Sequence, residues 1–199
     1  MDRSSQITGK LAFSLAVAPD SAAAAIGVAG YRADGLVHYE VVDYRPGTDW
    51  LVDRAKQVTG LRGRTIAVPK APAPASQFIP ALRRAGLTVR EIGGSEYATA
   101  CQALYTSFAE KQARHIDQPS LNAAGEGAFR KPTGDGWVWD PRSTVDICPL
   151  IAITVAGWSL DTPPEQRTPS VAGSDPDDLD ELVAQMAKEE ADELAALTA

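Results

Sequence analysis

The chain has 199 residues, of which 44% are hydrophobic, and this suits one α/β domain of ordinary size with a buried core. Its formal net charge of −7 is unevenly distributed, because residues 161–199 hold 11 acids and 2 bases whereas residues 1–160 hold 15 acids and 17 bases. The acidity therefore belongs to the C-terminal segment, and the rest is close to neutral. This balance excludes a strongly basic nucleic-acid-binding module, although a local patch could still contact phosphates.

Two cysteines, Cys101 and Cys148, limit the redox and metal chemistry of the chain. They form no CxxC pair, and two histidines are too few to complete a zinc site. We expect both thiols to be buried and reduced in a cytoplasmic protein. The longest apolar stretch, residues 147–160, is too short to cross a bilayer and contains Pro149, and no targeting segment is recognised.

Three antiparallel strands are predicted in the first quarter of the chain. Residues 11–18 form a buried run, and residues 22–31 form a second run of small residues. Asp34-Gly35 provides a hairpin turn, because glycine readily adopts positive φ. Residues 36–44 then alternate between two faces, as a strand does. The pattern predicts a three-strand meander.

Strands alternating with helices are predicted downstream of the meander. Thr48 is expected to cap a helix that includes Trp50 and Leu51. A short strand at residues 65–68 stops at Pro69, and another strand follows at residues 87–92. Two further helices are indicated by apolar residues at helical spacing, namely Phe78, Ile79 and Leu82 in the first, and Tyr97, Ala98, Cys101, Leu104, Tyr105 and Phe108 in the second, which starts at Ser95.

The combined pattern predicts an α/β fold with a mixed sheet, in which an antiparallel three-strand meander and parallel strands are flanked by helices. Residues 1–10 are expected to be a disordered N-terminus, and residues 11–160 to be the domain. Residues 161–176, rich in Pro, Ser, Thr and Asp, are expected to be a linker. Residues 177–199 are expected to be an acidic amphipathic helical tail, either solvated and partly helical or docked on a partner.

Three segments carry a resemblance to a known family. They are the first strand with its turn at residues 11–20, the hairpin segment at 34–50, and the apolar segment at 143–158, where Asp146 is expected to open a helix. In this order they resemble the C-terminal nuclease domain of phage terminase large subunits, the DNA-packaging motor proteins, over residues 11–160. The resemblance implies a ribonuclease H-like fold, a phage protein in the host cytoplasm, and an endonuclease site that binds Mg²⁺ or Mn²⁺.

Two-metal nucleases hold their cations with several converging carboxylates. The resemblance places one acid at Asp146, but it places the others where this chain has Ala16 and Pro69. Alanine and proline offer no ligand, and the neighbouring Lys70 would repel a cation. We therefore expect endonuclease activity to be impaired or lost, with Asp146 either a metal ligand or a helix-capping residue.

Asp20 is another candidate metal ligand, four residues after Ala16. It could replace the missing acid only if its loop folds back, and otherwise it is a turn residue. Glu91 and Glu96 flank the last predicted strand and are expected to be surface charges. An active Mg²⁺- or Mn²⁺-dependent endonuclease, using Asp146, Asp20 and a further acid, is therefore the second hypothesis.

Candidate DNA contacts lie in the second half of the chain. The resemblance places Arg130, Lys131 and Arg142 in the region that would face double-stranded DNA, with two tryptophans nearby. His115 matches a segment that leads into a helix near the cleft of the family. Its role is a phosphate contact, a general acid or a structural hydrogen bond.

The sequence lacks the GxxxxGK[ST] phosphate loop of a packaging ATPase, since its only Gly-Lys pair, Gly9-Lys10, is followed by Leu11. The chain is therefore expected to be a nuclease-like part of a terminase without its own motor. A third hypothesis is a non-catalytic adaptor of the packaging machinery. The tail at 177–199 is then a candidate docking element for the phage portal or the small terminase subunit.

Overall fold

The centre of the fold is a six-stranded mixed sheet, which the computed structural model describes within residues 5–60 and 63–161. All of these residues belong to one structural unit. The predicted tail at 177–199 and the predicted linker, apart from Asp161, lie outside the described residues, as do residues 1–4.

The predicted meander is formed by β1 (Leu11–Val17), β2 (Ala23–Tyr31) and β3 (Val37–Pro46), each antiparallel to the next. Three shorter strands extend this sheet with parallel pairs: β4 (Thr65–Pro69) lies beside β1, β5 (Thr88–Ile92) beside β4, and β6 (Ala113–His115) beside β3. The order is β5-β4-β1-β2-β3-β6. This confirms the mixed sheet and the ribonuclease H-like arrangement that the sequence predicts.

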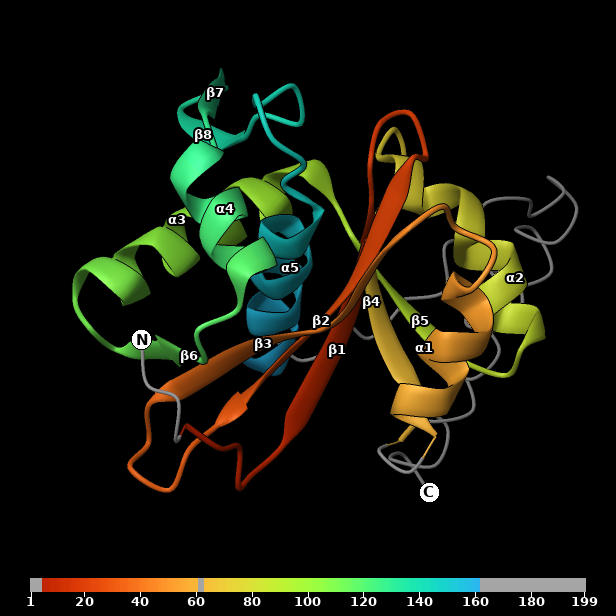
Figure 1. Cartoon of the computed structure of the whole chain (residues 1–199), viewed down its shortest axis with the longest axis horizontal. Helices are drawn as coiled ribbons and strands as arrows, with labels where there is room; N and C mark the ends of the chain where they lie inside the picture. Colours follow the sequence, from red (N-terminus) through yellow and green to blue (C-terminus); the bar gives the residue numbers. More distant parts are fainter. Residues whose placement is uncertain (1–4, 61–62, 162–199) are drawn as a thin grey trace, which may run out of the picture. The chain divides into compact units, whose positions relative to one another are not determined.

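Helices cover both faces of the sheet, as Figure 1 shows. One face carries α1 (Leu51–Thr59), the 3₁₀ helix η1 (Pro74–Phe78) and α2 (Ile79–Arg84), and the other carries α3 (Gly94–Ala109), α4 (Pro119–Gly127) and α5 (Cys148–Asp161). The alternation of β1 explains the two layers. Phe13, Leu15 and Val17 pack with α1 and α2, while Ala16 packs with the start of α5.

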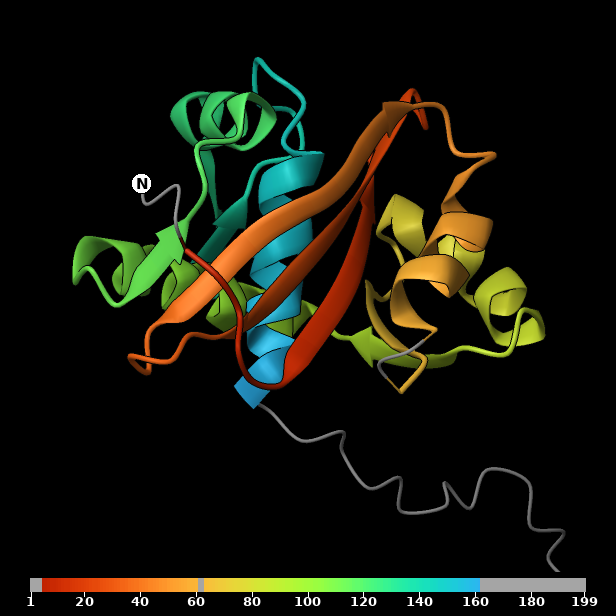
Figure 2. The same ribbon diagram turned by 60° about the horizontal axis from the view of Figure 1, so that its bottom comes forward.

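The helix α5 lies against the meander, as Figure 2 shows. Small residues, among them Gly27, Ala25 and Ala152, form this contact. A Cβ atom added to Gly27 of β2 would lie only 2.7 Å from the backbone carbon of Ala152. The buried Ser14 of β1 donates its hydroxyl hydrogen bond to the Ala152 carbonyl oxygen, so the polar atoms at this contact are paired. The start of α5 is thereby fixed relative to the end of β1.

Three local features differ from the sequence prediction. Trp50, and not Thr48, is the N-cap residue of α1, and its side chain makes no cap bond, while the Thr48 carbonyl accepts a turn hydrogen bond from the Leu51 amide. The helix after the last loop begins at Cys148, two residues beyond Asp146. A hairpin of β7 (Arg130–Thr133) and β8 (Gly136–Trp139) was not predicted, although its Asp135-Gly136 pair is a turn signal.

Residues 5–10 contact the domain, although the sequence predicted a disordered segment up to Lys10. The Ser5 hydroxyl lies 2.6 Å from Nδ1 of the buried His38 and accepts a hydrogen bond from Arg32. The backbone amides of Thr8 and Gly9 both donate to the Tyr31 carbonyl oxygen. These bonds hold the described part of the N-terminal segment against the β2–β3 end of the sheet.

Candidate functional site

The two positions at which the resemblance expects acids lie side by side in the sheet. Ser14 of β1 pairs with Ala67 of the parallel strand β4, so two residues further along Ala16 lies level with Pro69. Both residues are buried, and Ala16 packs against Cys148 and Ala152 of α5. The carboxyl ends of β1 and β4 and the start of α5 therefore meet at one place.

A cleft of about 430 Å³ opens at this place, and the three positions Ala16, Pro69 and Asp146 all line it. Its walls come from the ends of β1, β4 and β5, the starts of α3 and α5, and the β7–β8 hairpin. Asp146 is its sole acidic lining residue within the described part of the chain, and the cations that line it are Lys70 and Lys131. The three positions singled out from the sequence therefore share one cleft, in which two lysines and one carboxylate are the charged lining residues.

Asp146 is held by hydrogen bonds at both carboxylate oxygens. Its Oδ1 accepts a bond of 2.8 Å from the backbone amide of Cys148, and its Oδ2 accepts one of 3.0 Å from the Tyr44 hydroxyl. The first bond satisfies an otherwise free amide in the first turn of α5. Burial and the bond to Asp146 raise the pKa of Tyr44 to about 12. This geometry gives Asp146 a capping role.

The other candidate acids lie outside the cleft. Asp20 is exposed in the β1–β2 turn, where its Oδ1 accepts a bond of 3.0 Å from the amide of Ala22, as a turn residue does. Glu91 pairs with Arg83 at 2.7 Å, and Glu96 accepts a bond from the amide of Gly93.

The donor set does not fit a pair of divalent cations. In residues 5–60 and 63–161, nowhere do three or more His, Cys, Asp or Glu side chains gather as a group that could hold a metal ion. A two-metal site needs several carboxylates whose oxygens are free to turn toward the cations. The cleft offers one carboxylate, and both of its oxygens already accept hydrogen bonds.

Both cysteines are buried free thiols, as the sequence predicts. Cys148 lines the cleft, where burial and the nearby carboxylate of Asp146, with a smaller effect of Asp20, raise the pKa of its thiol. Burial raises the pKa of Cys101 to about 11. Both side chains are therefore protonated at neutral pH and act as apolar packing groups.

The candidate DNA-binding residues separate on the two faces of the β7–β8 hairpin. Lys131 and Thr133 are two residues apart on β7, so both lie on the face of the hairpin that lines the cleft. Arg130 points to the other side, where its guanidinium lies 3.9 Å from the centre of the Tyr105 ring and 4.7 Å from that of Trp137. Arg142 is exposed in the loop after β8, next to the cleft-lining Pro141. Of the predicted basic residues, Lys131 therefore shares the cleft with Asp146.

His115 lies away from the cleft, in a pocket of about 310 Å³ between α3 and α4. Its Nδ1 lies 2.8 Å from the Ile116 carbonyl oxygen, and because a carbonyl only accepts, Nδ1 carries the proton. Its ring meets Phe108 edge to face, with centroids 5.7 Å apart. Burial lowers the pKa of His115, which favours the neutral ring. This contact pattern is that of a structural histidine.

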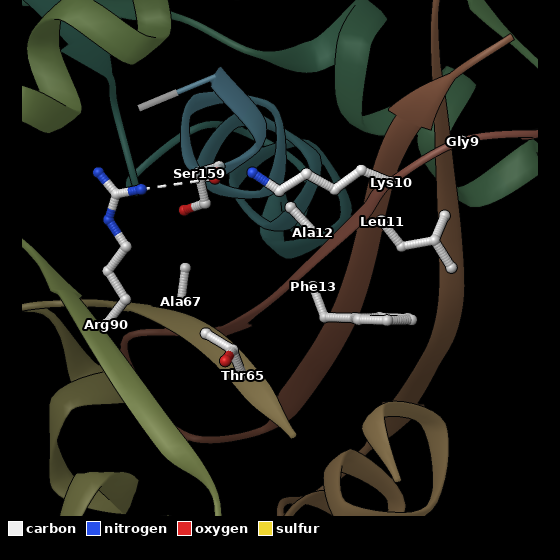
Figure 3. Close-up of a pocket in the computed structure, with 9 residues that line it drawn as sticks. All are labelled: Gly9, Lys10, Leu11, Ala12, Phe13, Thr65, Ala67, Arg90 and Ser159. Carbon is white, nitrogen blue, oxygen red and sulfur yellow. Dashed lines mark hydrogen bonds between the residues drawn. The ribbon is translucent and has the colours of Figure 1, made fainter. Parts of the chain in front are cut away.

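A second cationic pocket, of about 420 Å³, lies at the opposite ends of β1 and β4 (Figure 3). Lys10 and Arg90 approach the end of α5 there from two sides. The Lys10 ammonium donates to the Leu160 carbonyl oxygen at 3.1 Å, and Arg90 donates to that of Ser159 at 3.4 Å. Cations at a helix C-terminus satisfy its last carbonyls and oppose its dipole, so these residues stabilise α5.

Among the helices formed by residues 5–60 and 63–161, none is both long and apolar enough to cross a membrane.

The fold and the position of the cleft together define a class: a ribonuclease H-like α/β domain whose candidate site lies at the carboxyl ends of β1 and β4, beside the last helix. Solved structures of phage large terminases share this fold. The bacteriophage HK97 large terminase is 15% identical, with a TM-score of 0.61, and the match covers 76% of this chain and 40% of that one. This chain therefore spans less than half of the HK97 protein.

The large terminase nuclease from thermophilic phage G20c has the same fold. Its structure with bound magnesium gives a TM-score of 0.61 at 10% identity, over 78% of this chain and 84% of that chain. A second structure of that nuclease gives 0.60 at 11% identity, over 76% and 83%. No protein-family model and no curated protein matches the chain at the sequence level. The likeness confirms the terminase-nuclease-like fold that the sequence motifs indicated.

Proposed function

We propose that this chain is a nuclease-like domain of the terminase large-subunit type, which acts in phage DNA packaging and cleaves DNA weakly or not at all. One observation carries the proposal: Ala16 and Pro69 stand level on neighbouring strands in the same cleft as Asp146. In a two-metal nuclease such neighbouring positions would supply converging carboxylates. The methyl group of Ala16 and the ring of Pro69 cannot bind a cation, so Asp146 has no second carboxylate with which to hold a metal ion. Metal affinity and cleavage rate are both lowered as a result.

Double-stranded DNA is the proposed partner, contacted through basic residues around the cleft such as Lys131 and Arg142. Contacts with the portal or the small terminase subunit are assigned to the C-terminal segment 177–199. The site of action is the cytoplasm of the host cell. The large terminases of similar fold support the packaging role, and the magnesium ion in the G20c nuclease supports a metal-dependent ancestor.

An active endonuclease that uses Asp146 and Asp20 with Mg²⁺ or Mn²⁺ is the competing proposal. Asp20 lies in the turn that follows the end of β1, next to the cleft-lining Pro19. It would have to give up its bond to Ala22 and reach past Pro19 to join Asp146.

Cleavage of supercoiled plasmid DNA in Mn²⁺ and in Mg²⁺ tests the two proposals. The unaltered chain is expected to leave the plasmid intact, and the double variant Ala16→Asp, Pro69→Asp is expected to cut it. Cleavage by the unaltered chain that Asp146→Ala abolishes would overturn the proposal in favour of the competing one. Because Ala16 is buried, circular dichroism is used to check that the double variant folds. If the double variant is unfolded, cleavage or lack of cleavage by the unaltered chain alone decides between the two proposals.

A further inference from the structure

The cleft at the carboxyl ends of β1 and β4 is richer in positive than in negative groups. Lys70, in the loop after β4, and Lys131, on the β7–β8 hairpin, line it from different elements. Neither ammonium group has an ion-pair partner among the described residues. The one carboxylate, Asp146, already accepts two hydrogen bonds. The two lysine charges are therefore uncompensated within the described residues.

The backbone adds to this positive character. The helices α3 and α5, of 16 and 14 residues, both begin at the cleft, where Gly93, Gly94 and Cys148 line it. A helix N-terminus directs amides and the positive end of its dipole outward, which favours an anion. The Cys148 amide of α5 is already bonded to Asp146, and the Gly93 amide before α3 is bonded to Glu96, so the exposed Gly94 at the start of α3 is the place to approach. Gly94 is exposed and a Cβ placed on it would meet nothing within 4 Å, so its amide can be approached closely.

An unused donor also lies in the cleft wall. The hydroxyl of Tyr97 is buried and makes no hydrogen bond to the described residues, and the Cys101 thiol beside it is a weak partner. Burial raises the pKa of Tyr97 well above its usual value, so the hydroxyl keeps its proton. The Tyr97 side chain therefore adds a neutral group, and no negative charge, to the wall of the cleft.

We propose that this cleft is a metal-independent phosphate-binding site, in which Lys70 and Lys131 take the place of divalent cations as the countercharge. The phosphate group lies between the two ammonium groups and against the start of α3. This assignment rests on the proposed function, because it takes a phosphodiester of DNA as the phosphate source. The lysines supply charge directly, so binding needs no carboxylate cluster and no metal.

Fluorescence anisotropy of a short labelled DNA duplex with the full chain tests the proposal. Binding in EDTA is expected to equal binding in Mg²⁺, and Lys70→Glu and Lys131→Glu are each expected to weaken it about ten-fold or more. Lys56→Glu is the matched control, because Lys56 is exposed on α1 at the other face of the sheet. Lys70→Gln is expected to reduce the slope of log affinity against log salt by about 1.

Two results would overturn the phosphate site and leave the proposed function standing: equal affinities of the cleft variants and Lys56→Glu, or loss of DNA binding in EDTA with recovery in Mg²⁺. If the unaltered chain binds no DNA, the DNA-binding part of the proposed function fails instead. Inorganic phosphate, followed by ³¹P line broadening, then tests the cleft alone. Broadening that Lys70→Glu and Lys131→Glu remove supports a site for free phosphate, and no broadening overturns it.

Discussion

Asp146 has a structural role that is independent of any metal-binding role of its carboxylate. Its carboxylate caps α5 through the amide of Cys148 and orients the hydroxyl of Tyr44, which comes from β3. A capping aspartate needs no metal to be explained, since satisfying an exposed amide stabilises the helix. Asp146 therefore has a structural reason to be present even where metal-dependent chemistry is absent.

Removal of this cap should lower stability measurably. Asp146→Ala is expected to reduce the free energy of unfolding by about 1 kcal/mol, because the first turn of α5 loses its acceptor. Urea denaturation followed by circular dichroism measures the change. Asp146→Asn keeps an acceptor oxygen and should lie close to the unaltered chain, whereas equal losses in both variants would mean that charge, and not capping, is what matters.

Tyr44 is expected to ionise late. Its pKa is raised from 10.0 to about 12, first by burial and then by the bond to Asp146. Because a raised pKa favours the neutral phenol in the folded state, this contribution to stability is present below pH 10 and is lost as pH rises toward 12. The difference in tyrosinate absorbance between the unaltered chain and Tyr44→Phe should titrate near 12. A midpoint near 10 would contradict the hydrogen bond.

At the scale of elements, the contact between β2 and α5 depends on the absence of side chains. The carbonyl carbon of Ala152 lies 2.7 Å from the position of a Cβ on Gly27, and the Tyr39 ring lies 2.6 Å from that on Gly157. These are backbone and ring atoms in a buried layer, so they cannot move aside freely. The helix that carries the cleft residue Cys148 is thereby held to the sheet.

Gly27→Ala is therefore expected to destabilise the protein by about 1–3 kcal/mol through overpacking. Thermal unfolding monitored by circular dichroism gives the comparison. Gly125→Ala in α4 is the matched control, since no atom lies within 4 Å of its added methyl group and helix propensity favours alanine. If Gly27→Ala were as stable as this control, the contact between β2 and α5 would be able to accommodate a methyl group without loss of stability, which would contradict the prediction.

The main elements were predictable because their residues form buried apolar runs, as in β1, or repeat with strand or helix periods, as in β3 and α3. The β7–β8 hairpin could not be predicted in this way, because β7 (Arg130–Thr133) is exposed throughout and shows no alternation of apolar and polar residues. For the same reason its two faces were not separated, and Arg130 and Lys131 were expected to act together. Asp135-Gly136 was the available signal.

The meeting of three positions in one cleft could be inferred from the sequence, whereas the full lining of the cleft could not. Ala16, Pro69 and Asp146 lie far apart in the chain, and only their order with the surrounding strands indicated that they meet. Tyr97 and Thr133 line the cleft, and Tyr44 bonds to Asp146, only through tertiary contacts that no spacing in the sequence encodes. These contacts required the strand register and the packing of α5 on the sheet.

At the scale of the whole molecule, function depends on how a nearly balanced charge is arranged. Residues 1–160 hold 15 acids and 17 bases, so the proposed affinity for DNA has to come from a local arrangement and not from net charge. The cleft offers such an arrangement in Lys70, Lys131 and the start of α3. Under the proposed function, these lysines provide the positive charge in a cleft that has a single carboxylate.

The most direct test of this account is a titration of the full chain with Mn²⁺, in which the free ion is followed by electron paramagnetic resonance. Any weak binding by exposed acids is common to the unaltered chain and Asp146→Asn, so the comparison isolates the cleft. The account predicts that the two binding curves coincide. One or two ions bound by the unaltered chain and lost in Asp146→Asn would show that the cleft is a metal site and would contradict the account.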